Sequence, residues 1–220
     1  MRKINRSSPS VEFSKWVANN RTAQWGDFVK NAHDLYLDVR DLLKQDQNGV
    51  SGYTENPLCK EHIDHFRTRN LFPNPKCVFD WYNFVVDEKD ESQFGSGVKD
   101  TIVDINDYNS NIIINPIVED PHYFFTYSLN GEIIPRPSLS DVEKYRAIRT
   151  IELFNLNHQT LVSCRAEIIN FFQCLNDEYT IEQMESDWRN SGFYSLYDFY
   201  RENVGAFDPK IPIFPYFRNH

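Results

Sequence analysis

The feature that most constrains the fold is a break in helical periodicity between residues 50 and 109. Before this break, residues 11–45 place apolar side chains at three- and four-residue steps, as one face of a helix requires. Within the break, prolines, asparagines and β-forming residues take over, and residues 62–66 and 78–86 are typical of two short strands. After this break, the three- and four-residue spacing of apolar side chains returns in the C-terminal part of the chain. We therefore expect an α+β fold with a small sheet between helical layers.

Downstream of the break, turn and capping signals predict a hairpin followed by helices. Asn130-Gly131 is a favoured two-residue hairpin turn, and Ser140 with Glu143 matches a capping box. The expected strands cover residues 111–115, 122–127 and 132–134. The expected helices run from Ser140 to about Leu156, from near Leu161 to Leu175, and onward from Thr180 and Ser195, before an extended tail at 209–220.

We expect one domain, because no long flexible linker divides the chain. Its predicted segments are a helical lead-in (1–49), a core (50–109), short strands and a hairpin (110–137) and a C-terminal helical layer (138–220).

Composition excludes several classes of protein. Hydrophobic residues make up 40% of the chain and aromatic residues 15%, which favours a folded chain over a disordered one. No apolar run is long enough to cross a bilayer, and the basic first residues are not followed by the apolar stretch of a signal peptide. We expect a cytoplasmic protein without membrane contact. The four cysteines form no CxxC pair, so we expect neither a zinc ribbon nor disulfides.

The net charge of −9 limits how the chain can act on nucleic acid. Most nucleic-acid-binding proteins gain affinity from a basic surface. An acidic chain with such a target must gather its positive charges locally or rely on a partner for them.

One short segment carries the groups that phosphodiester hydrolysis needs, namely a base, a cation and a side chain that holds the base in place. Asp64 is a hard oxygen ligand suited to Mg²⁺ or Mn²⁺, and His65 titrates near neutrality, as a general base should. Asn83 could fix the His65 loop or the imidazole. In a regular strand Asp64 and His65 face opposite ways, so Asp64 must lie at a bend for both to reach one phosphate.

Positive side chains near this segment are candidates for substrate binding. Arg67 points to the same side as His65 if the strand is regular, and its guanidinium can bind phosphate with two hydrogen bonds. We assign Arg69 and Lys99 to substrate binding as well, and His62 to a helping role in catalysis.

The run Asp64-His65-Phe66-Arg67, followed by residues 79–84 (Phe-Asp-Trp-Tyr-Asn-Phe), resembles the motif of HNH nucleases of the PtuB family, which act in Septu and retron-associated antiphage defence. The similarity continues in order over about residues 11–172. It includes residues 13–16, 25–28, 42–49, 115–121 and 150–157, with Leu161 and Arg165.

The resemblance implies a ββα-metal (HNH) core flanked by N-terminal and C-terminal helices. It also implies a divalent metal, Mg²⁺ or Mn²⁺, at Asp64. The implied partner is a PtuA-like ABC/SMC-type ATPase, joined in some systems by a retron reverse transcriptase and its msDNA. DNA is the usual target of this class.

Departures from the family pattern concern metal ligands. Many members carry two cysteine pairs for structural zinc, but residues 51–55, Glu88 and Gly95 stand at those places, so we expect no structural zinc. The family's metal-binding Asn aligns with Ser96. Three carboxylates are candidates for the missing ligand, and the sequence does not rank them: Asp87, Asp100 and Asp104.

Other interpretations of the same residues remain open. The chain could be a catalytically inactive module that docks on the ATPase, or a nuclease for RNA. His62 and His65 could be ordinary strand residues. A fourth hypothesis is a tetrahedral zinc site made by Cys59, His62, His65 and Cys77.

Overall fold

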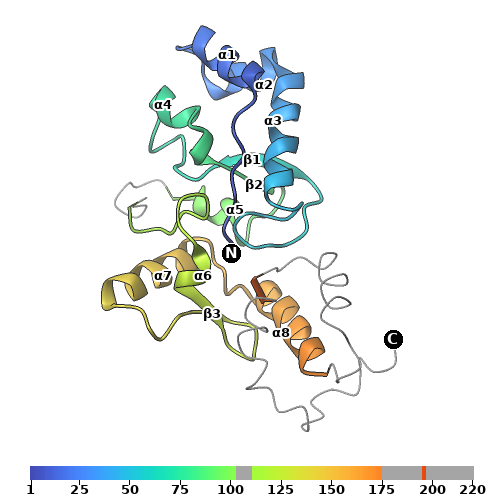
Figure 1. The fold of residues 1–220 in the computed structure, drawn as a ribbon, viewed down its shortest axis with the longest axis vertical. Coiled ribbons are helices and arrows are strands. Elements are labelled where there is room, and N and C mark those ends of the chain that lie inside the picture. Colours follow the sequence, from blue (N-terminus) through green and yellow to red (C-terminus); the bar gives the residue numbers. More distant parts are fainter. Residues whose placement is uncertain (103–110, 175–194, 197–220) are drawn as a thin grey trace.

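The computed structural model describes residues 1–102, 111–174 and 195–196. In this part of the chain, helices surround two small antiparallel hairpins, which confirms the expected α+β class (Figure 1). Some predictions lie outside the described residues: the helix expected from Thr180, the tail at 209–220 and the metal-ligand candidate Asp104. No helix in the described ranges combines the length and the apolar character needed to cross a bilayer.

The predicted N-terminal helical segment forms three helices rather than one: α1 (Val11–Asn19), α2 (Trp25–Asn31) and α3 (His33–Asp46). Polar side chains end the first helix and start the second. The Asn20 amide donates to the Trp16 carbonyl (2.8 Å), and Asp27 accepts from the backbone N–H of Gln24 (2.8 Å). Apolar spacing predicted the helical state but missed the breaks, because local capping bonds decide where a helix ends.

The central hairpin joins β1 (Glu61–His65) to β2 (Phe84–Glu88) in antiparallel register, with His62 opposite Asp87 and His65 opposite Phe84. The first strand lies within one residue of its prediction. The prediction of a strand beginning at residue 78 is wrong, because helix α4 (Pro75–Val78) and the 3₁₀ turn η1 (Trp81–Asn83) occupy that segment. Short apolar runs do not distinguish a buried strand from a buried helical turn.

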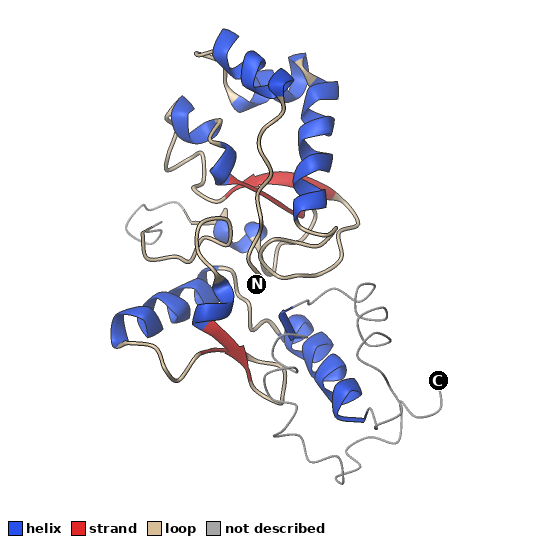
Figure 2. Cartoon of the chain, in the orientation of Figure 1, coloured by secondary structure: helices blue, strands red, loops and turns tan. Residues whose placement is uncertain are grey.

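The hairpin separates two hydrophobic clusters, and Figure 2 shows it between α1–α4 on one side and the elements from α5 (Ser96–Lys99) onward on the other. Because strand side chains alternate, Ile63, Phe84 and Val86 pack toward the N-terminal helices, whereas Val85 packs the other way. The N-terminal cluster also contains Phe13, Trp25, Phe28, Phe79 and Trp81. The second cluster includes Tyr53, Phe66, Phe94, Ile114 and Phe154.

Beyond the hairpin, the described part of the structure has four helices and two strands. They are α5 (Ser96–Lys99), α6 (Pro121–Phe124), β3 (Phe125–Tyr127), β4 (Ile133–Pro135), α7 (Asp141–Leu153) and α8 (Gln159–Cys174), together with the helical residues 195–196. The capping box is confirmed, since Glu143 accepts from the Ser140 N–H (2.9 Å) at the start of α7. The second hairpin is also confirmed, but the strand expected at 122–127 begins only at Phe125, because α6 takes up the residues before it. Residues 128–132 form a longer loop than the predicted two-residue turn.

The predicted strand at 111–115 is wrong. Ile113 and Ile114 are buried, but this segment is irregular and pairs with no strand in the described structure. The Ile114 N–H instead donates to the Thr150 hydroxyl on α7 (3.0 Å). The apolar run therefore reflects burial rather than sheet formation.

The N-terminal segment connects the two halves around the hairpin (Figure 1). Near its start, the Ile4 N–H donates to the Pro116 carbonyl (2.8 Å). Further along, the Arg6 guanidinium donates to the Phe84 carbonyl (2.6 Å), and the Trp81 indole donates to the Ser7 carbonyl (2.6 Å). These bonds attach the N-terminal segment to the start of β2 and to residue 116 in the later half of the chain.

Candidate active site

Asp64 and His65 lie on opposite faces of β1. The Asp64 carboxylate accepts from the Tyr53 hydroxyl (2.6 Å) and from the Lys99 ammonium (3.0 Å) on the C-terminal side. The His65 ring lies on the other side, edge-on to Trp25 and Phe84, with ring centroids 4.5 Å and 5.2 Å away. The strand stays paired through His65, so the bend that would bring both groups to one phosphate is not present.

The surroundings of His65 keep its imidazole neutral. Only 3% of the residue is exposed, and burial lowers its pKa to about 3. Nε2 lies 2.9 Å from the Val78 carbonyl, which can only accept, so Nε2 carries the proton. Nδ1 is then the nitrogen with a lone pair, which is the atom that would accept a proton from water.

Asn83 clamps the segment that follows β1. It lies in η1, not on the second strand as predicted. Its Oδ1 accepts from the Arg67 N–H (2.6 Å), while Nδ2 donates to the carbonyls of Arg67 (3.2 Å) and Cys77 (2.9 Å). The buried amide thus joins the segment directly after His65 to the end of α4.

The three predicted substrate-binding cations have different environments. Arg67 forms a partly exposed ion pair with Asp80 (2.7 Å), and the exposed Arg69 places its guanidinium 5.9 Å from the centre of the Trp25 ring. Because β1 ends at His65, regular strand alternation does not extend to Arg67. Lys99 is fully buried and, as placed, offers no surface to a nucleic acid.

His62 shares a face with Asp64 and lies opposite Asp87. Its Nδ1 is 3.2 Å from the Asp87 carbonyl oxygen. The Asp87 carboxylate is buried and accepts from the Ser51 hydroxyl (2.5 Å) and the Ser96 N–H (2.7 Å). Burial raises the pKa of Asp87, which these hydrogen bonds partly oppose. His62 and His65 therefore belong to different sites.

Sequence reasoning missed Tyr53, which supplies one of the two side-chain bonds to Asp64. No catalytic pattern includes this tyrosine. It lies in residues 51–55, which align with a zinc-binding segment of the family that the chain resembles. That alignment was the signal in the sequence that could have pointed to Tyr53. In this chain the segment contributes Ser51 and Tyr53 to the two buried carboxylates instead.

As placed, these residues do not fit a divalent metal at Asp64. One oxygen of its carboxylate is bound to a hydroxyl and the other to an ammonium. Among the described residues, no group of three or more His, Cys, Asp or Glu side chains could hold a metal ion. The hypothetical zinc site is not assembled either, because His62 and His65 face opposite ways and Cys59 is exposed.

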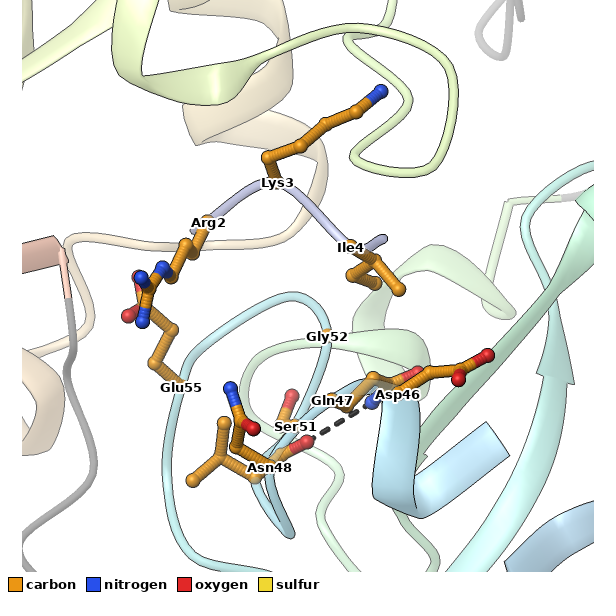
Figure 3. Close-up of a pocket in the computed structure, with 10 residues that line it drawn as sticks. Arg2, Lys3, Ile4, Asp46, Gln47, Asn48, Ser51, Gly52 and Glu55 are labelled. Carbon is orange, nitrogen blue, oxygen red and sulfur yellow. Dashed lines mark hydrogen bonds between the residues drawn. The ribbon is translucent and has the colours of Figure 1, made fainter. Parts of the chain in front are cut away.

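A pocket lies beside Ser51, between the N-terminal segment and the turn after α3 (Figure 3). Its lining includes Arg2, Lys3, Asp46 and Gln47, and the Gln47 amide donates to the Val50 carbonyl within it (2.9 Å). The predicted site residues do not line this pocket. It therefore gives no support to a substrate site at the hairpin.

Comparison with protein-family models and with curated proteins gave no match for this chain. The chemistry must be judged from the site itself. A neutral imidazole is held by the Val78 carbonyl at the end of α4, and the guanidinium of Arg69 lies over the same tryptophan that the imidazole contacts. Such groups can accept a proton and bind a phosphate, provided that a substrate reaches them.

Proposed function

We propose that the chain is an HNH-type nuclease that hydrolyses phosphodiester bonds, in DNA rather than RNA, within an antiphage complex. The observation that carries the proposal is the Asn83 clamp, whose three hydrogen bonds fix the segment leaving the Asp64-His65 strand. This arrangement supports the loop-fixing role predicted for Asn83. The ordered resemblance over about residues 11–172 supplies the class of reaction.

In this proposal His65 is the base and Asn83 positions its loop. Nδ1 of the neutral imidazole accepts the proton of the attacking water, while Arg67 and Arg69 bind the phosphate. His65 is almost fully covered, and burial lowers its pKa to about 3, which is too low for a general base near neutral pH. The proposal therefore requires the packing at Trp25 to open when substrate or partner binds, so that the ring is hydrated and its pKa rises. Mg²⁺ or Mn²⁺ dependence is implied by the resemblance, but we derive no step through a metal because Asp64 does not fit one as placed.

The net charge of −9 favours action in a complex. A partner that supplies basic surface would hold the nucleic acid near the hairpin, which an acidic chain does poorly alone. The proposed partner is an ABC/SMC-type ATPase of the PtuA kind, with a retron reverse transcriptase and its msDNA as a further component in some systems.

The test compares His65→Gln with His62→Gln in the chain assembled with its ATPase. Glutamine can still donate toward the Val78 carbonyl but cannot act as the base. We expect His65→Gln to lower DNA cleavage by about 10²–10⁴-fold and to abolish phage protection, with His62→Gln retaining both. A folded His65→Gln protein with wild-type cleavage would refute the proposal. RNA is assayed in parallel, because attack by water does not need a 2′-hydroxyl.

A second candidate is a non-catalytic HNH-like module that docks on the ATPase. One observation favours it: the Lys99 ammonium neutralises Asp64, while His65 lies in the apolar layer on the other face. This candidate predicts that Asp64→Asn and His65→Gln both retain phage protection, and that no cleavage is detected in the wild-type complex. The same assays therefore separate the two functions.

A further inference from the structure

Lys99 is a buried cation with three oxygen partners. Its ammonium donates to Asp64 Oδ1 (3.0 Å), to the His65 carbonyl (2.9 Å) and to Asp100 Oδ1 (2.6 Å). An ammonium has three hydrogens to donate, so these bonds use its full capacity. The side chain is 0% exposed. Its charge is therefore compensated within the protein rather than by solvent.

The helix that carries Lys99 is fixed at both ends by carboxylates beside the hairpin. At its start, Asp87 accepts from the Ser96 N–H (2.7 Å), and Gly95 turns the chain with a φ of 67° that L side chains rarely adopt. At its end, Asp64 and Asp100 bind the Lys99 ammonium. The packing of α5 against the hairpin therefore determines where this ammonium lies.

The charges favour the ammonium form of Lys99. Burial by itself lowers the pKa of this group, but the negative charges of Asp64 and Asp100 outweigh it, so the pKa lies above its usual value. The three oxygens lie 2.6–3.0 Å from Nζ, which is hydrogen-bond distance. A Mg²⁺ ion would require oxygens at about 2.0–2.1 Å in octahedral geometry.

We infer that the resident cation of the Asp64 carboxylate is the chain's own Lys99 ammonium, which excludes a divalent metal ion from this position. Two carboxylates and a carbonyl are oxygen donors that suit Mg²⁺ or Mn²⁺ in general. With the ammonium in place, both oxygens of Asp64 and the oxygen of Asp100 that faces Lys99 are already hydrogen-bonded, and the local charge is already compensated. Removing the ammonium is expected to leave an anionic set of oxygens open to a divalent ion. The inference concerns occupancy, so it does not depend on whether the chain cuts nucleic acid.

The test measures Mn²⁺ binding to the full chain by the loss of the electron paramagnetic resonance signal of free Mn²⁺. The wild-type chain and Asp64→Asn should bind the same amount of Mn²⁺, because weak surface binding does not involve Asp64. A Mn²⁺ ion bound by the wild-type chain and lost in Asp64→Asn would overturn the inference. This comparison does not require any change at Lys99.

Lys99→Met provides the second arm, with Lys99→Met/Asp64→Asn as its matched control and circular dichroism to verify folding. Lys99→Met should gain one bound Mn²⁺ per chain and should melt at a higher temperature when Mn²⁺ is added. The double variant should show neither effect. A folded Lys99→Met protein that binds no more Mn²⁺ than the wild type would also overturn the inference. If Lys99→Met does not fold, the comparison of the wild type with Asp64→Asn decides.

Discussion

The two faces of the β1–β2 hairpin are both buried but are stabilised differently. The face toward α1–α3 is mainly apolar and aromatic, and the buried His65 ring on it has a carbonyl rather than a carboxylate as its bonding partner. The opposite face buries Asp64 and Asp87 with Lys99, Tyr53 and Ser51. Burial without an opposite charge favours the neutral form of His65 and of Asp87, whereas the carboxylates of Asp64 and Asp100 favour the charged form of Lys99. Substitution and pH should therefore affect the two faces in different ways.

The largest effect is expected on the charged face. Lys99→Met removes the cation that compensates Asp64, and breaking a buried ion pair should lower the free energy of unfolding by about 5 kcal/mol. Replacing both partners, in Asp64→Leu/Lys99→Met, should recover part of this loss. Denaturant unfolding measures both. Lys60→Met at the exposed Lys60–Asp90 pair is the control and should leave the midpoint unchanged. Equal midpoints for Lys99→Met and Lys60→Met would show that the charged face contributes no stability.

On the apolar face, Phe84→Ala should cost about 4 kcal/mol, since it leaves a cavity beneath three aromatic rings. Phe84 is fully buried against Phe13, Trp25 and Trp81. Tyr82→Ala, at a side chain that is 55% exposed, should change the denaturation midpoint little. A small loss in Phe84→Ala would mean that the helices do not depend on this face of the hairpin.

A smaller effect is expected at the junction of the two strands. Asn83→Ala removes three hydrogen bonds to the Arg67 and Cys77 backbone and should cost about 2 kcal/mol. Thermal unfolding provides the measurement. Asn74→Ala is a matched control in the same loop, because Asn74 is exposed and makes one turn bond, to the Lys76 N–H. Equal decreases in melting temperature for Asn83→Ala and Asn74→Ala would contradict the proposal that Asn83 fixes this segment.

The last prediction concerns acid. Because burial lowers the pKa of folded His65 to about 3, the unfolded chain binds a proton that the folded chain does not between about pH 6.5 and 3. The free energy of unfolding is therefore not reduced by His65 above about pH 6.5. Below that pH it falls by up to about 1.4 kcal/mol per pH unit, because protonation of His65 favours the unfolded chain. Denaturant titrations over this range should show a shallower dependence in His65→Gln. An unchanged slope would mean that the His65 ring is not excluded from water.

Several elements of the fold could be predicted from local sequence. The first strand, the capping box at Ser140 and the second hairpin depend on neighbouring residues, which the sequence displays directly. The strand errors at 78–83 and 111–115 share one cause. Both segments are apolar because they are buried, and burial alone does not specify a backbone conformation.

By itself, the sequence determined that Asp64 and His65 must diverge in a regular strand, because side chains alternate at every residue. It also determined which groups were available near the hairpin: the imidazoles of His62 and His65, several carboxylates and few cations. Only the tertiary structure decided that β1 stays regular through His65, that Trp25 covers the ring, and that α5 brings Lys99 to Asp64. These contacts join residues far apart along the chain, and their geometry depends on how whole elements dock, which no local pattern records.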